Sequence, residues 1–278
     1  MAGTKRAATK KASAKKAGAS GTAATRASAK GSATTRTARK APRKAASSGG
    51  PDGAFTGFPK GGEAFFEELA AHQDREWFKA NKARYESLWQ RPLEAFLDAV
   101  AERLEEAFPG ASTTKRKIFR IYRDVRFSAD KSPYKTHAGA IVPLLPAGSA
   151  EHGALVAYFH FDASERYGGV GFYELPKDAL RRYRVAVASD DGEELVRRIR
   201  ALEKRKFELL SREALKRVPP GFPQDHPRAD LLRRKGLFFR FPPISKTAIR
   251  KPELVGWVGE RAAEARPALD WVREHAGV

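Results

Sequence analysis

The chemically most active part of the sequence lies between residues 117 and 137. It combines guanidinium, ammonium, carboxylate, phenol and imidazole groups, which belong to Arg120, Arg123, Asp124, Arg126, Asp130, Lys131, Tyr134, Lys135 and His137. A guanidinium group can bind two oxygens of a carboxylate or phosphate at once, and cations outnumber carboxylates in this segment. The segment therefore predicts a site for an anionic ligand.

A purely structural role explains the same residues. Asp124 and Asp130 can pair with Arg120, Arg123 and Arg126 and so lock a turn of the chain. Ion pairs of this kind are common on protein surfaces and require no ligand. The sequence leaves both interpretations open.

Residues 117–127 have the alternation of a β-strand. In that conformation one face is apolar, formed by Phe119, Ile121, Val125 and Phe127. Arg123 falls on this apolar face, where an unpaired charge is costly. We therefore expect that Arg123 has an acidic partner or that the strand bulges, and that a turn then returns residues 134–137 toward the same end of the sheet.

His160 is the candidate general acid or base. In a strand expected over residues 155–162, Tyr158 and Asp162 share its face, and the opposite face is apolar. The reference pKa of histidine, near 6.5, suits proton transfer at neutral pH. Asp124 is a second candidate for handling protons. A histidine on a strand can also be a structural residue, so the pattern alone does not establish catalysis.

The sequence shows no cofactor motif. It has no cysteine, which excludes disulfides, thiolate metal sites and a cysteine nucleophile. Its six histidines are scattered, although three of them can still converge in the folded chain. The glycine-rich run over residues 168–171 does not open a helix as a dinucleotide-binding loop does, and predicts a bulge or a close backbone approach in a strand. We expect no cofactor and no metal.

The positive charge of the chain is concentrated at its N-terminus. The 53 Lys and Arg residues exceed the 33 Asp and Glu residues, which gives a net charge of +20. Residues 1–50 contain thirteen of the basic residues, no acidic residue and no Leu, Ile, Val or aromatic residue. Because such a segment has nothing to bury, we expect residues 1–53 to form a disordered tail and linker.

The composition of this tail is similar to that of the lysine- and alanine-rich tails of linker histones and some bacterial nucleoid proteins. Its basic clusters include Lys10, Lys11, Lys15, Lys16, Arg39, Lys40, Arg43 and Lys44. Contacts between these side chains and phosphates would give non-specific, salt-dependent binding to DNA or RNA. A solubilising extension and an organellar transit peptide are the alternatives.

Residues 54–278 are expected to fold as a single α+β domain. Helical patterns occupy residues 63–108, short strand patterns lie between 117 and 175, and helices return over 177–206 and 252–275. Pro267 should break or kink the last helix. Helices, then strands, then helices indicate a central, mostly antiparallel sheet. No apolar run is long enough to span a membrane.

A longer motif within residues 117–137 resembles the signature of the DUF2461 family of conserved hypothetical proteins. It reads Arg-x-x-Arg-Asp-x-Arg-Phe-x-x-Asp-Lys-x-x-Tyr and runs from Arg120 to Tyr134. Asn81, Tyr85, the glycine run over residues 168–171 and the segment 225–227 fit the same resemblance, which covers residues 55–275. The resemblance implies no activity, because the function of the family is not known.

The sequence therefore predicts an anion-binding domain that its polycationic tail tethers to nucleic acid. The alternative is an enzyme that acts on a phosphorylated or carboxylated substrate through the Arg, Lys and His side chains. The expected partners are DNA or RNA at the tail and a small anion at the domain, with no membrane partner. We expect a cytoplasmic protein, with association with the nucleoid as a further possibility.

Overall fold

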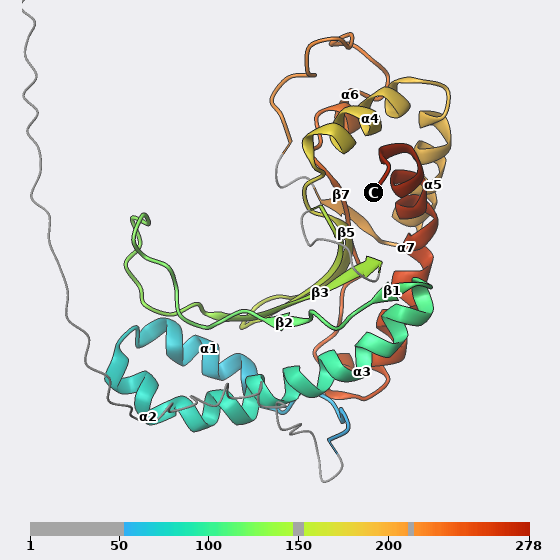
Figure 1. Ribbon diagram of the computed structural model, residues 1–278. Coiled ribbons are helices and arrows are strands. Elements are labelled where there is room, and N and C mark those ends of the chain that lie inside the picture. Colours follow the sequence, from blue (N-terminus) through green and yellow to red (C-terminus); the bar gives the residue numbers. More distant parts are fainter. Residues whose placement is uncertain (1–52, 147–152, 211–213) are drawn as a thin grey trace, which may run out of the picture. The chain divides into compact units, whose positions relative to one another are not determined.

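The computed structural model describes residues 53–146, 153–210 and 214–278. The expected basic tail, apart from its last residue, lies outside this part of the chain. Within it, helices come first, strands occupy the middle and helices return at the C-terminal end (Figure 1). This order confirms the α+β fold that the sequence predicts.

The N-terminal helices form one nearly continuous stretch of helical chain. They are α1 (Gly62–Ala71), α2 (Arg75–Tyr85), the π-helical turn η1 (Glu86–Gln90) and α3 (Arg91–Ala107). Asp74 caps α2, because its carboxylate accepts a hydrogen bond from the backbone N–H of Trp77 at 2.7 Å. Pro92 lies in the first turn of α3, a position that the fixed backbone dihedral of proline suits.

The strands of the described chain form one antiparallel sheet in the order β1-β3-β4-β5-β7-β6, with β2 paired to β3. Their bounds are β1 (Ala111–Ser112), β2 (Lys117–Ile118), β3 (His137–Pro146), β4 (Leu155–Asp162), β5 (Arg166–Phe172), β6 (Glu208–Leu210) and β7 (Leu237–Arg240). The antiparallel pairing agrees with the sequence prediction. The short strands β1 and β6 were not predicted, since two or three residues carry no readable alternation.

The C-terminal helices include one long helix with an internal proline. They are α4 (Lys177–Ala188), α5 (Gly192–Lys204), α6 (Ala229–Leu232), the 3-10 turn η2 (Ala248–Arg250) and α7 (Leu254–Ala276). Helix α7 is not broken at Pro267 but runs through it. Both Pro267 and Ala263, whose carbonyl loses its helical partner, are exposed, so water can satisfy that carbonyl.

The core lies between the sheet and two long helices. Helices α3 and α7 pack against each other and against one face of the curved sheet (Figure 1). On β4 the residues that point to these helices are buried, and the ring of Phe159 meets that of Phe96 in α3 at 5.0 Å between centroids. The residues on the other face of β4 are only half-buried. No helix in the described ranges is long and apolar enough to cross a membrane.

The expected strand over residues 117–127 is wrong beyond Ile118. Residues 119–136, which we name the arm, lie outside the regular strands and fold back on themselves, although the backbone N–H of Phe119 still donates to Gly139 of β3 at 2.8 Å (Figure 1). The backbone N–H of Arg123 donates to Pro133 at 2.9 Å, and that of Lys135 donates to Ile121 at 2.7 Å. Side-chain exposure still alternates from Phe119 to Val125, with Ile121 buried, but Phe127 at the tip of the arm is 95% exposed.

Candidate functional site

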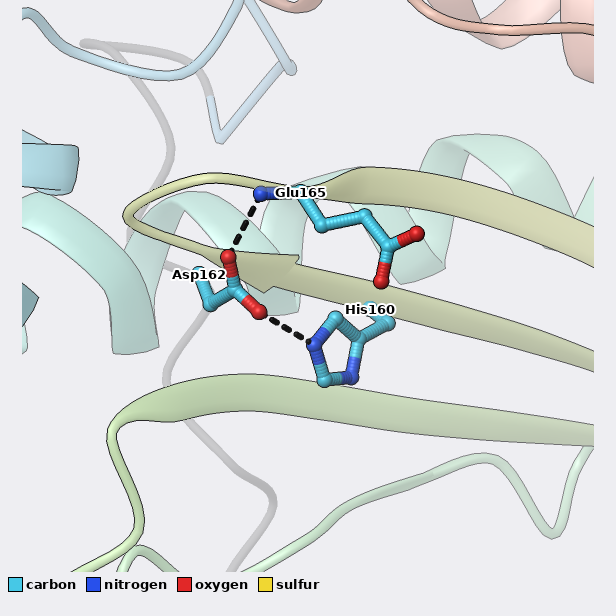
Figure 2. Close-up of side chains that lie close together, drawn as sticks. All are labelled: His160, Asp162 and Glu165. Carbon is cyan, nitrogen blue, oxygen red and sulfur yellow. Dashed lines mark hydrogen bonds and ion pairs between the residues drawn. The ribbon is translucent and has the colours of Figure 1, made fainter.

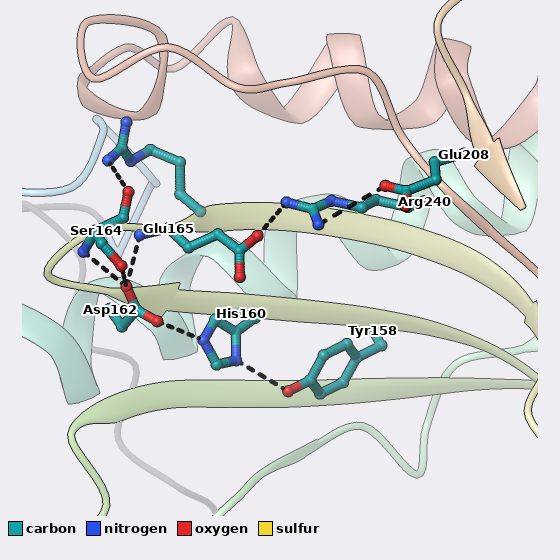
Figure 3. Close-up of polar contacts among 8 residues, drawn as sticks. Tyr158, His160, Asp162, Ser164, Glu165, Glu208 and Arg240 are labelled. Carbon is teal, nitrogen blue, oxygen red and sulfur yellow. Dashed lines mark hydrogen bonds and ion pairs between the residues drawn. The ribbon is translucent and has the colours of Figure 1, made fainter. Parts of the chain in front are cut away.

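The half-buried face of β4 carries three polar side chains in a row. His160 lies between Tyr158 and Asp162, two residues away on either side, because alternate residues of a strand share one face. The hydroxyl of Tyr158 is 3.2 Å from Nδ1 of His160, and Nε2 of His160 is 3.0 Å from Oδ2 of Asp162 (Figure 3). Both nitrogens of the imidazole are therefore held in fixed hydrogen bonds.

Two aromatic rings enclose the imidazole of His160. His137 on β3 stacks on one side at 4.6 Å between ring centroids, and Tyr167 on β5 stacks on the other at 5.0 Å. The register explains this arrangement, because β3 and β5 are the two neighbours of β4. Burial, His160 and Lys135 lower the pKa of His137 to about 4, so His137 is neutral at pH 7.

The tight turn between β4 and β5 fixes Asp162. Its Oδ1 accepts hydrogen bonds from the backbone N–H and hydroxyl of Ser164 and from the backbone N–H of Glu165. Burial alone would raise the pKa of Asp162, but the hydrogen bonds from His160 and the turn outweigh it and lower this pKa to about 2. Asp162 is therefore a fully ionised, preoriented carboxylate.

A guanidinium group borders this row on the β7 side. Arg240 donates to Oε1 of Glu165, and its Nη1 is 3.8 Å from a carboxylate oxygen of Glu208 (Figure 3). The same guanidinium lies over the ring of Tyr167, 4.3 Å from its centroid. Arg240 thus connects the stacked rings around His160 to the carboxylates of the turn and of β6.

A group of cations borders the row on the arm side. Burial and repulsion by Arg120 and Arg123 lower the pKa of Lys135. Asp130 forms an ion pair with Arg123, which is the acidic partner that the sequence requires. Within the described residues, neither Arg120 nor Lys135 forms an ion pair with a carboxylate, and the ammonium of Lys135 lies 5.5 Å from the ring centroid of Phe119.

The structure separates the other residues of the motif from this cluster. Arg126 pairs with Asp124 by two hydrogen bonds from its side chain, and Lys131 donates to the carbonyl of Val125 at 2.9 Å, so all remain within the arm. The buried Tyr134 stacks on Phe78 of α2 at 4.4 Å between centroids and anchors the base of the arm. Of the sequence candidates, Arg120, Arg123, Lys135, His137 and His160 come together.

A mostly apolar cavity of about 500 Å³ opens on the same face of the sheet. Its lining includes Phe119, Ile141, Val156, Tyr158, Tyr167 and Phe238. Three of these residues also touch the polar groups: Phe119 contacts Lys135, Tyr158 shares a hydrogen bond with His160, and Tyr167 stacks on His160. The cavity therefore borders the charged cluster, although Arg120, Arg123 and Lys135 do not themselves line it.

The glycine run of β5 shapes the cavity. A Cβ atom on Gly169 would lie 2.4 Å from the ring of Phe238 and 2.6 Å from the carbonyl oxygen of Phe239. The expected close backbone approach is confirmed, and β4 and β5 pair without a bulge from Leu155 to Phe161. The absent side chain lets the ring of Phe238 lie over the neighbouring strand.

Sequence reasoning missed three members of the site: Glu165, Tyr167 and Arg240. Glu165 and Tyr167 lie within or just after the turn between β4 and β5. Had residues 155–172 been predicted as a β-hairpin, the pairing across its turn would have placed Tyr167 opposite His160. Arg240 lies about eighty residues further along the chain, and only the pairing of β5 with β7 brings it to Glu165. No local sequence pattern carries that information.

The comparison with known proteins identifies a family. No curated protein and no solved structure matches this chain. The family described as conserved hypothetical protein (DUF2461) matches residues 63–271, a range that includes the motif in the arm and every residue of the site. The chain that folds into this curved sheet, with its stacked histidines and arginine-rich arm, belongs to the DUF2461 family.

Proposed function

We propose that the domain binds a small amphipathic anion. The apolar part of the ligand would occupy the cavity, and its carboxylate or phosphate group would meet Arg120, Arg123 and Lys135. The single observation that supports this most strongly is the surplus of positive charge at the cavity end. Lys135 is held near two guanidinium groups although their repulsion opposes its charge, and an anion would relieve this repulsion.

A pair of fluorescent probes tests the proposal. Anilinonaphthalene sulfonate and phenylnaphthylamine have closely similar aromatic bodies, and only the first carries a negative charge. The protein should bind the sulfonate more tightly than the neutral probe in buffer containing EDTA, and the preference should weaken as salt increases. Equal affinity for the two probes would reject the anion site.

Variants separate the two ends of the site. Lys135→Gln should lower the affinity for the sulfonate about tenfold, the effect of losing one charge-assisted hydrogen bond, and leave the neutral probe unaffected. Phe238→Ala should lower the affinity for both probes, because it removes part of the cavity wall. Lys251→Gln, an exposed lysine outside the cavity lining, is the matched control.

An enzyme acting on a phosphorylated or carboxylated substrate is the second candidate, and the Tyr158–His160–Asp162 row favours it. Both nitrogens of the imidazole are engaged, so it would exchange protons with a ligand through the hydroxyl of Tyr158, which lines the cavity. A screen of phosphate and carboxylate esters should then reveal turnover that His160→Gln abolishes while the melting temperature is retained. Activity loss that only follows unfolding would contradict this role.

We also propose that the basic tail tethers the domain to nucleic acid. The tail lies outside the described residues, so support comes from its thirteen basic residues and the absence of acidic ones among residues 1–50. Deleting residues 1–50 should lower the affinity for single-stranded DNA and reduce the slope of log K against log salt. An unchanged slope would exclude the tail as the anchor.

A further inference from the structure

Three potential metal ligands converge at the β4–β5 turn. One nitrogen of His160 and one carboxylate oxygen each from Asp162 and Glu165 lie within 4.8 Å of one another (Figure 2). His160 and Asp162 end β4, and Glu165 precedes β5, so a single hairpin supplies all three. This spacing is short enough for small side-chain rotations to bring the three atoms around one ion.

Hydrogen bonds from neighbouring groups orient Asp162 and His160. These neighbours lie outside the space between the three potential ligand atoms. The turn binds Oδ1 of Asp162 and leaves Oδ2 facing His160. Tyr158 engages Nδ1 of His160, so the ring can present Nε2 to an ion while Nδ1–H donates to the hydroxyl. Such an outer hydrogen bond is a regular feature of metal-binding histidines.

Arg240 supports Glu165 in the same way. Its guanidinium donates a hydrogen bond to Oε1 of Glu165, so Oε2 remains available to an ion. A carboxylate oxygen of Glu208 lies 3.8 Å from the same guanidinium. Metal-binding carboxylates are commonly hydrogen-bonded on the oxygen that does not bind the metal. Among the described residues, Asp162 has no Lys or Arg ion-pair partner, and the guanidinium of Arg166 donates to the carbonyl of Ser164 in the same turn rather than to one of these carboxylates.

We propose that His160, Asp162 and Glu165 bind a divalent transition-metal ion such as Zn²⁺ or Mn²⁺. One imidazole nitrogen with two carboxylate oxygens suits these ions better than Ca²⁺ or Mg²⁺, which prefer oxygen ligands alone. Water would complete the coordination. The site goes beyond the proposed anion binding and does not depend on it.

Titration of the metal alone tests the site. Full-length protein without a histidine tag, stripped with EDTA and then dialysed, is titrated with zinc chloride and with manganese chloride by isothermal calorimetry. We expect saturable binding of one ion per chain and a rise in melting temperature. Binding that does not saturate, or that shows no preference for one site per chain, would overturn the proposal.

The variants locate the site. Glu165→Gln and His160→Gln should each weaken zinc binding by at least roughly tenfold, the scale on which neighbouring groups tune metal affinity. Glu208→Gln is the matched control, because Glu208 shares Arg240 with Glu165 but offers no ligand atom. Equal losses in Glu165→Gln and Glu208→Gln would contradict the assigned ligands.

X-ray absorption of the zinc-loaded wild-type protein is independent of how the variants fold. One imidazole and otherwise oxygen ligands are expected, and two or more imidazoles would reject the site as assigned. Because the probe experiments above are performed in EDTA, failure of the metal site and failure of the anion site give different results.

Discussion

The imidazoles of His137 and His160 are stacked, with ring centroids 4.6 Å apart and an angle of 27° between their planes. They come from paired neighbouring strands, and both lie on the face of the sheet opposite α3 and α7. Two protonated imidazoles at this separation would repel each other, so the stack favours the neutral state of at least one ring. The pKa of His137, about 4, is consistent with this.

The first prediction concerns stability at acidic pH. Between pH 6.5 and about 4 the unfolded chain binds a proton at His137 and the folded protein does not, so the free energy of unfolding falls as the pH falls. The groups that act on this ring are His160, Lys135, Asp162 and Arg123. We expect a loss of about 1 to 2 kcal/mol, a value reduced for the partial exposure of the ring.

Urea unfolding at several pH values, with EDTA present, measures this loss. His137→Gln should flatten the pH dependence between 6.5 and 4, whereas His72→Gln, which replaces an exposed histidine outside the sheet, should not. A second loss, between pH 3.8 and about 2, should remain in His137→Gln because it belongs to Asp162. A pH profile that His137→Gln does not change would contradict the assignment.

The second prediction concerns the glycine under Phe238. Gly169→Ala should lower the free energy of unfolding by about 1 to 3 kcal/mol, because the added methyl meets a ring and a backbone carbonyl. The same variant should lower the affinity for the neutral fluorescent probe, because the added methyl displaces Phe238, which lines the cavity. Gly256→Ala in α7 is the matched control: nothing lies within 4 Å of its added Cβ, so stability should be unchanged or raised by up to about 1 kcal/mol.

The third prediction concerns the tip of the arm. Phe127 is 95% exposed, so Phe127→Ala should change the free energy of unfolding by no more than about 0.5 kcal/mol. If the arm binds single-stranded DNA by stacking a base on this ring, the affinity of Phe127→Ala should fall about tenfold. Phe127→Trp should retain binding. Equal affinities for all three proteins would exclude stacking at Phe127.

The fourth prediction concerns the base of the arm. The side-chain oxygen of Gln73 accepts a hydrogen bond from the backbone N–H of Tyr134 at 3.1 Å. Gln73→Ala leaves this donor without its acceptor, which should favour local opening of the arm by about 1 to 3 kcal/mol. Trypsin should then cleave after Arg126 and Lys131 roughly tenfold faster. Gln224→Ala, which removes a comparable bond to Val218, should leave this cleavage rate unchanged.

The sequence predicts the face of β4 correctly but not the path of the arm. Alternation places Tyr158, His160 and Asp162 together because a regular strand in a sheet has only two faces. Over residues 119–125 the alternation also describes which side chains are less exposed, but the backbone beyond Ile118 forms no regular strand and Phe127 is exposed. Whether an apolar side chain is buried depends on what lies opposite it, and local sequence does not contain this information.

The composition of the site shows the same limit. His137 is close to His160 because β3 pairs with β4, and Lys135 at the base of the arm acts on His137, whereas Arg126 and Lys131 have their partners nearer the tip of the arm. A motif that is continuous in sequence is thus divided between the site and the arm. Arg240 enters the site from β7, which a motif search over residues 117–137 cannot find.

The position of Phe238 over Gly169 has a consequence for the range of ligands that the cavity can hold. The ring of Phe238 occupies the space that a side chain at position 169 of β5 would fill. One wall of the cavity is therefore an aromatic side chain rather than the backbone of a strand. Rotation about a single side-chain torsion is enough to enlarge or close that space, and hydrogen bonds of the sheet need not break. In the proposed binding mode, the rotamer of Phe238 would set the length of ligand that fits the apolar end, without any change at Arg120, Arg123 and Lys135.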